Sequence, residues 1–149
     1  MSLETKIMEQ MKEAMKSKNS IALEALRAIK SEILLLKTSG SNHEISESQE
    51  ISILQKMIKQ RKEAAEQFSA NNRNELAEKE MAQSEVIQKF LPEQLSAEEL
   101  ESKIKEIIAQ TGAASPKDMG KVMGVAGKEL AGKAEGKMIA DTVKKLLNQ

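Results

Sequence analysis

The stretch "SESQEISILQKMIKQRKEAAEQFS", residues 46–69, carries the strongest helix pattern in this sequence. Its apolar residues recur mostly three or four positions apart, at Ile51, Leu54, Ile58, Ala65 and Phe68. That spacing is typical of one buried face on an α-helix. Ser46 and Gln49 stand three residues apart, as in a capping box, where two side chains satisfy N–H groups at a helix start. We therefore expect a capped helix of roughly 30 Å.

The composition of the remaining chain favours the same kind of element. Ala, Glu, Lys, Leu, Met and Gln dominate, with nine Met, two Phe and no Trp or Tyr. These residues form helices readily, whereas residues that favour strands are scarce. The sequence predicts an all-α fold. The expected helices span residues 2–17, 20–38, 46–69, 73–90, 97–111, 116–131 and 136–148.

Further local signals support these elements. Three more pairs have capping spacing or a close relative of it: Asn72 with Glu75, Ser96 with Glu99, and Ser115 with Asp118. In the first helix, methionines also recur at helical spacing, at Met8, Met11 and Met15. We interpret this methionine stripe as core rather than as a ligand groove.

The segment "FLPEQLS", residues 90–96, predicts a domain boundary. Leu91 precedes a proline, which disfavours the helical conformation, and Ser96 begins a new helix. Long helices with short loops favour an antiparallel bundle before this point. We expect a four-helix N-terminal bundle over residues 1–91, a linker over 92–95 and a small three-helix C-terminal domain over 96–149.

The bulk composition excludes several classes of site. The 149 residues carry 23 basic and 23 acidic side chains, no cysteine and one histidine, His43, in a polar loop. A disulfide framework, a His/Cys zinc cluster and a Cys/His nucleophile pair are therefore impossible. We expect no metal, no cofactor and no catalytic residue. The chain start lacks a signal-peptide pattern and no apolar run reaches 18 residues, so we expect a cytoplasmic protein without a membrane partner.

The segment "KDMGKVMGVAGKEL", residues 117–130, is helical by the phase of its apolar residues yet contains three glycines. Each glycine costs about 1 kcal/mol relative to alanine in a helix interior. At 100° per residue, one side of this helix is an ordinary core face, made by Met119, Val122, Met123, Ala126 and Leu130. The opposite side brings Lys117, Lys121, Gly124 and Lys128 within about 60° of one another, flanked by Gly120, Gly127 and Ala131.

The sequence that follows adds to this positive surface. "GKAEGK", residues 132–137, contributes two glycines, Lys133 and Lys137 at a corner just before the last helix. A helix N-terminus favours an anion. From Lys117 onward there are seven lysines and four acidic residues in an otherwise neutral chain. Glycines would let a polyanion approach closely while lysines neutralise phosphates, giving affinity but little sequence readout.

The same residues have a structural interpretation. Gly120 and Gly124 form G-x-x-x-G, which can simply let a neighbouring helix pack closely, and Gly132 can be a helix C-cap. Lysine-rich faces are usually just solvated. A second basic cluster, "KMIKQRK" at residues 56–62, is partly cancelled by nearby glutamates. From the residues alone, phosphate contact and helix packing remain open.

Several of these segments resemble the bacterial GatB/YqeY family, in particular its small stand-alone YqeY-like members. The segments are "RAIKSEI" (27–33), "QKMIKQRKEAAEQF" (55–68), "FLPEQLS" (90–96), "DMGKVMG" (118–124) and "KAEGKMIADTVKKLL" (133–147). The part from Met119 onward is similar to the tail of GatB, a component of aspartyl/glutamyl-tRNA amidotransferases. In that family the tail contacts tRNA and is not the chemical centre. The resemblance implies an RNA-facing set of Gly120, Lys121, Gly124, Lys128, Lys133 and Lys137.

Together these observations predict a tRNA-binding accessory protein, with Lys117 added to that set by its place on the helix wheel. The resemblance also implies amidotransferase or aminoacyl-tRNA synthetase components as candidate partners. One alternative is a helical protein–protein adaptor that uses G-x-x-x-G as a docking groove. Another is a component of a carbon–nitrogen ligase with glutamine as amido donor, although the large catalytic part of GatB has no counterpart in this chain.

Overall fold

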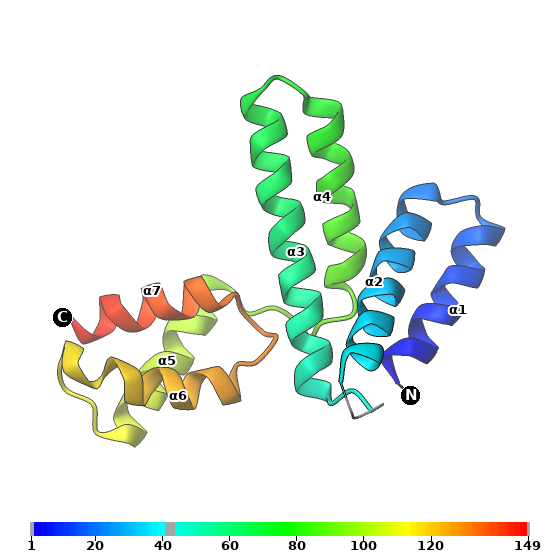
Figure 1. Ribbon diagram of the computed structural model, residues 1–149. Coiled ribbons are helices and arrows are strands. Elements are labelled where there is room, and N and C mark those ends of the chain that lie inside the picture. The colour runs from blue at the N-terminus through cyan, green and yellow to red at the C-terminus, as the bar shows by residue number, and fades with distance from the viewer. Residues whose placement is uncertain (1, 41–43, 149) are drawn as a thin grey trace. The chain divides into compact units, whose positions relative to one another are not determined.

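The computed structural model describes residues 2–40 and 44–148, and within those ranges all regular structure is helical. His43, expected in an exposed loop, lies outside the described residues. The all-α fold class is therefore confirmed (Figure 1). The α-helices are α1 (Leu3–Lys16), α2 (Ser20–Ser39), α3 (Glu47–Ala70), α4 (Asn74–Gln88), α5 (Ala97–Thr111), α6 (Met119–Glu129) and α7 (Gly136–Leu147), with a 3₁₀ turn, η1 (Pro116–Asp118), directly before α6.

Contacts between Cα atoms divide the chain into two compact units, Met1–Leu91 and Pro92–Gln149, here called the N-terminal and C-terminal units. In the N-terminal unit, α1 and α2 form one helical hairpin, and α3 and α4 form a second, longer one (Figure 1). The hairpins meet where α2 packs against α4 and α3. In the C-terminal unit, α5, α6 and α7 all pack against one another.

Each unit has its own apolar core because each buries the stripes of its own helices. The N-terminal core holds Leu26, Ile29 and Ile33 of α2 against Leu54 and other residues of α3. The C-terminal core is built separately from α5, α6 and α7. Its largest fully buried side chains are Leu100, Ile104, Ile107, Val122 and Val143, none more than 1% exposed.

The helix starts follow the capping pairs of the sequence with one exception. Ser46 with Gln49 and Ser96 with Glu99 each exchange both capping hydrogen bonds, at 3.0–3.2 Å. Asn72 does not cap α4, contrary to the pairing of Asn72 with Glu75. It takes a left-handed conformation (φ 60°) in the α3–α4 turn, which asparagine tolerates better than most residues. Arg73 becomes the N-cap and makes no side-chain capping bond.

The interpretation of the methionine stripe as core was wrong. Met8 and Met15 are 48% and 53% exposed, and Met11 is half-buried against the N-terminal core. The buried face of α1 consists of Leu3, Ile7 and Ala14 instead. Since α1 packs mainly on α2, its core face is narrow, and methionines at its edges stay in contact with water.

A polar network ties α2 to the α3–α4 hairpin. Gln83 on α4 is only 8% exposed; its side-chain oxygen accepts a hydrogen bond from Arg61 Nε on α3 at 3.2 Å. Its Nε2 donates to Glu24 Oε2 on α2 at 2.9 Å, and Lys79 Nζ lies 3.2 Å from the same carboxylate oxygen. One amide thus links three helices, which fixes how they face one another.

Truncating this amide should destabilise the protein. Gln83→Ala leaves Arg61 Nε and Glu24 without this partner, at an expected cost of about 1–3 kcal/mol in the free energy of unfolding. The control is Gln60→Ala, an exposed glutamine on α3, which should change stability by less than about 0.5 kcal/mol. Urea unfolding followed by far-UV circular dichroism measures both. Equal stabilities of the two variants would contradict the role given to Gln83.

The start of η1 and α6 should make stability depend on pH. Asp118 Oδ2 accepts hydrogen bonds from the backbone N–H groups of Ala114 (2.9 Å) and Ser115 (3.3 Å). These bonds, with a smaller contribution from the charge of Lys121, lower the pKa of Asp118 in the folded state. A lowered carboxyl pKa stabilises the fold above the unfolded pKa, and that stabilisation disappears as pH falls through the folded value.

We therefore expect Asp118→Asn to melt below the unaltered protein at pH 7, with the difference in Tm shrinking as the pH approaches about 3. Hydrogen bonding to Ser96 likewise lowers the pKa of Glu99, but Glu99 is present in both proteins and cancels from the difference. Thermal melts by circular dichroism across this pH range provide the test. A Tm difference that stays constant with pH would show that the charge of Asp118 contributes nothing.

Candidate nucleic-acid interface

The orientation of α6 is set by its apolar side. Val122 and Ala126 are completely buried, and Leu130 just after the helix is 2% exposed, all within the C-terminal core. Met119 and Met123 pack at the edge of the same core. This is the core face expected from the helical wheel. Burying it turns the other side of α6 toward solvent.

The glycines of α6 lie on that solvent side. Gly120, Gly124 and Gly127 are exposed, and a Cβ atom added to any of them would meet no neighbouring atom within 4 Å. Within the described part of the C-terminal unit no other helix is packed against them, so G-x-x-x-G does not serve as a packing motif in that unit. The three glycines leave a strip of helix backbone without side chains.

Lysines border this strip. We call Lys117, Gly120, Lys121, Gly124 and Lys128 the glycine–lysine face, and all five are exposed. Among residues 2–40 and 44–148, the salt bridges of the C-terminal unit join Lys105 and Lys145 to Glu101 and involve none of these three lysines. The charge of Lys121 acts on nearby Asp118 without a direct ion pair. The ammonium groups of this face are therefore available to an anion.

The α6–α7 corner, residues 130–135, is held by hydrogen bonds from the segment expected to be a linker. Gln94 Nε2 donates to the carbonyl oxygen of Gly132 at 2.6 Å, and Leu95 N donates to that of Lys133 at 2.9 Å. Gly132 is buried with φ 77°, a conformation that favours glycine. The backbone of Lys133 is thus fixed while its side chain is exposed. Residues 94 and 95 accordingly pack with the C-terminal unit.

Lys137 is the last of the residues that the sequence predicts to face RNA. It is exposed in the first turn of α7, two residues after Glu135, whose side chain makes no capping hydrogen bond to this helix. The C-terminal unit therefore presents Lys117, Lys121 and Lys128 from η1 and α6, and Lys133 and Lys137 from the corner and α7. Basic side chains with bare backbone between them suit electrostatic contact with phosphates.

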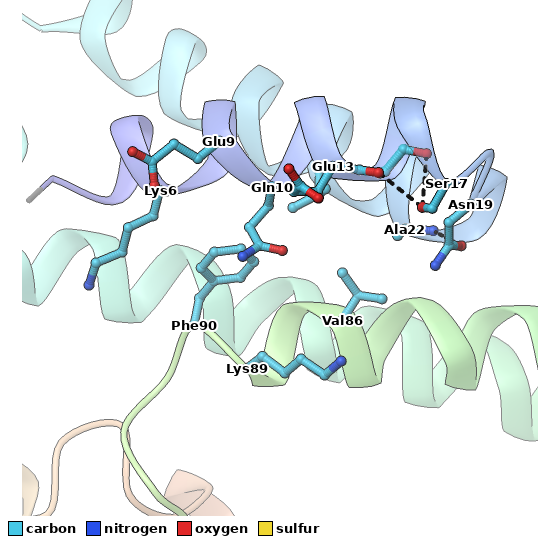
Figure 2. Close-up of a pocket in the computed structure, with 12 residues that line it drawn as sticks. Lys6, Glu9, Gln10, Glu13, Ser17, Asn19, Ala22, Val86, Lys89 and Phe90 are labelled. Atoms are coloured by element: carbon cyan, nitrogen blue, oxygen red, sulfur yellow. Dashed lines mark hydrogen bonds between the residues drawn. The ribbon is translucent and has the colours of Figure 1, made fainter.

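The N-terminal unit has a cleft of its own, between α1 and the end of α4 (Figure 2). It measures about 390 Å³, and Gln10 of α1 faces Phe90, just after α4, across it. Its charged lining consists of Lys6 and Lys89 with Glu9 and Glu13. Because the two signs balance, this cleft offers an anion no advantage, unlike the glycine–lysine face.

Other classes of site find little support in the part of the chain that the structure describes. Within it, no group of three or more His, Cys, Asp or Glu side chains is arranged to hold a metal ion. No described helix is both long and apolar enough to cross a membrane. Chemically, the glycine–lysine face offers local positive charge and accessible backbone, although the C-terminal unit as a whole has as many acidic as basic residues.

Sequence reasoning missed the residues that support the corner. Gln94 follows no periodic pattern, and its neighbours Pro92 and Ser96 suggested only a break between helices. Gln94 is a long amide donor and Gly132 lies just beyond α6 and its C-cap, Leu130, but no sequence pattern links the two. These residues are 38 positions apart, and only the fold brings them together.

Comparison with known proteins places these observations in a family. The family model described as Yqey-like protein matches residues 4–147. One relative, the "Altered inheritance of mitochondria protein 41, mitochondrial" of Candida glabrata, is 32% identical over 71% of this chain. That match covers 60% of the relative's own length. The "Uncharacterized protein C22F3.15" of Schizosaccharomyces pombe is 35% identical over 63% of this chain and 76% of its own.

The family match includes both units, with the α3–α4 hairpin, the proline after α4 and the glycine–lysine face. It reaches almost from the first described residue to the last. The chain therefore belongs to the Yqey-like protein family.

Proposed function

We propose that this protein binds structured RNA, with tRNA as the first candidate, through the glycine–lysine face together with Lys133 and Lys137. The observation that supports this most is the open space above Gly120, Gly124 and Gly127. Since alanine would fit at each position and favour the helix by about 1 kcal/mol, fold stability does not account for these glycines. Close approach of a bulky ligand does.

The charge beside the strip supports a phosphate-rich ligand. The bordering lysines are exposed, and within the described chain their ammonium groups form no salt bridge. Lysine is a flexible point charge, suited to phosphates at varied positions. The C-terminal unit contains no aromatic residue on which a base could stack. Recognition would therefore rest on the sugar–phosphate backbone and the shape of a folded RNA.

The similarity of this region to the tRNA-contacting tail of GatB supports tRNA over other polyanions. On this proposal the chain acts as an accessory to tRNA-dependent amidation or a related step of translation. Amidotransferase or aminoacyl-tRNA synthetase components are the corresponding protein partners.

A second candidate function is a protein–protein adaptor. The observation in its favour is the same open strip, because a helix of another protein could lie against Gly120 and Gly124, where no described helix of the C-terminal unit does. The two functions differ in what they require. RNA binding needs the lysines, whereas close helix packing needs mainly the glycines.

Reversing charge on the glycine–lysine face should weaken RNA binding without unfolding the protein. We expect Lys121→Glu/Lys128→Glu to reduce affinity for tRNA about tenfold or more. The slope of log affinity against log salt concentration should become shallower by roughly 0.9 for each phosphate contact that is lost. The measurement is a tRNA gel shift across a salt series, with circular dichroism to verify folding. The matched control, Lys12→Glu/Lys103→Glu, reverses two exposed lysines on other helices.

The proposal requires the control to bind like the unaltered protein. If tRNA binding is undetectable at low salt, or the Lys121/Lys128 variant binds normally, RNA binding through this face is excluded.

Substitutions at Gly124 should separate stability from binding. Gly124→Ala has room for its Cβ and should raise the free energy of unfolding by about 0.5–1 kcal/mol. Gly124→Leu puts a bulky side chain on the bare strip and should impair binding while the protein stays folded. Under the RNA proposal, both this variant and the lysine variant lose tRNA. A partner protein lost with Gly124→Leu but kept with the lysine variant would favour the adaptor.

A further inference from the structure

A groove runs between α3 and α4 in the half of the hairpin near their connecting turn. It measures about 1070 Å³ and is lined by residues from 62 to 70 on α3 and from 74 to 85 on α4. Small side chains line both walls: Ala65, Ala70, Ala77 and Ala82. Met81, 39% exposed, adds a long apolar side chain. The hairpin therefore offers a trough between two helical walls, with apolar side chains from both helices in its lining.

The groove lies on the side of α4 away from α2. The polar network that joins α4 to α2 uses Gln83 and Lys79. Met81 points about 160–200° away from both on a wheel of 100° per residue. The hairpin thus has one face packed on α2 and another that is grooved. In the groove Ala65 and Ala77 are buried, Ala82 is half-buried and Met81 is exposed.

The charges around the groove are mostly negative. Three glutamates line it, Glu66, Glu78 and Glu85, against a single lysine, Lys62, which already interacts within the chain. Over residues 62–85 there are six acidic and three basic residues. A ligand in this trough would therefore meet an apolar floor and an acidic rim.

We propose that this groove binds an amphipathic helix of another protein, with small or medium apolar residues on one face and Lys or Arg on its flanks. A helix laid into a groove buries residues at i, i+3, i+4 and i+7, which matches a trough between two helices. The volume is at or above the upper end of the range for small-molecule pockets. Complementary charge favours a basic partner.

The same charge disfavours a second copy of this chain. Two identical hairpins placed groove to groove would bring Glu66, Glu78 and Glu85 of each close to those of the other. Like charges brought together at an interface are unfavourable. This site lies on different helices from the glycine–lysine face and does not depend on the RNA proposal.

The test uses the full chain and a synthetic peptide of about 18 residues, long enough for several helical turns. Its Ala and Leu residues occupy one helical face and its Lys residues the flanks. A control peptide has the same composition in an order that spreads the apolar residues around the helix. Isothermal titration calorimetry should show one-to-one binding of the first peptide, at least tenfold tighter than that of the control.

Variants locate the site. Glu78→Lys/Glu85→Lys should weaken peptide binding at least tenfold, whereas Glu9→Lys/Glu106→Lys, which reverses exposed charges on α1 and α5, should leave it unchanged. Ala82→Leu partly fills the trough and should also weaken binding. Circular dichroism establishes whether each variant is folded. If Ala82→Leu disturbs the fold, the charge variants still test the site.

Three results would overturn the proposal. If neither peptide binds, the groove is not a binding site for a helix of this chemistry. Equal binding of the two peptides, or equal loss with both charge-reversal pairs, would indicate general charge attraction. Sedimentation equilibrium showing a dimer that Ala82→Leu dissociates would mean that a second copy occupies the groove.

Discussion

The burial of Val122, Ala126 and Leu130 against α5 and α7 determines what the C-terminal unit can present to a partner. A helix has a fixed angular spacing, so fixing one face also fixes the opposite one. With those three side chains in the core, the glycines of α6 face solvent and Lys121 and Lys128 stand beside them. The chemistry of the exposed face is therefore a direct consequence of apolar packing beneath it.

Charge is distributed unevenly in a chain whose formal net charge is zero. Positive residues gather from Lys117 onward, and negative residues gather around the α3–α4 groove. Neutrality overall keeps long-range attraction weak, and screening limits the field of each patch to a range of about 8 Å in physiological salt. Two regions of opposite sign can therefore act on different partners without a strong field from the molecule as a whole.

Much of this fold could be predicted from the sequence, because its signals are local. Periodic apolar residues predicted the helices, and Ser46 and Ser96 marked helix starts through side chains only three residues away. The errors arose where tertiary context decides. Whether Met8 is buried depends on how much of α1 another helix covers, and Asn72 serves the α3–α4 turn rather than the helix that follows.

The candidate site shows the same division. The phase of the glycines and lysines on α6 was readable at 100° per residue, and their exposure agrees with it. The support of the corner by Gln94, the cleft between α1 and α4, and the groove along the α3–α4 hairpin were not readable. Each combines residues from separate elements, and a single sequence carries no signal for such pairings.

The hydrogen bonds from Gln94 and Leu95 matter for any dissection of the molecule. A fragment beginning at the capping Ser96 would contain every helix of the C-terminal unit. It would lack the two hydrogen bonds that Gln94 and Leu95 donate to the carbonyl oxygens of Gly132 and Lys133. In that fragment the α6–α7 corner would lack these hydrogen bonds and would be less ordered. A weaker affinity for a ligand would then wrongly suggest that the N-terminal unit takes part in binding. A fragment that begins at Pro92 keeps both hydrogen bonds, so this proline is the natural place to divide the protein.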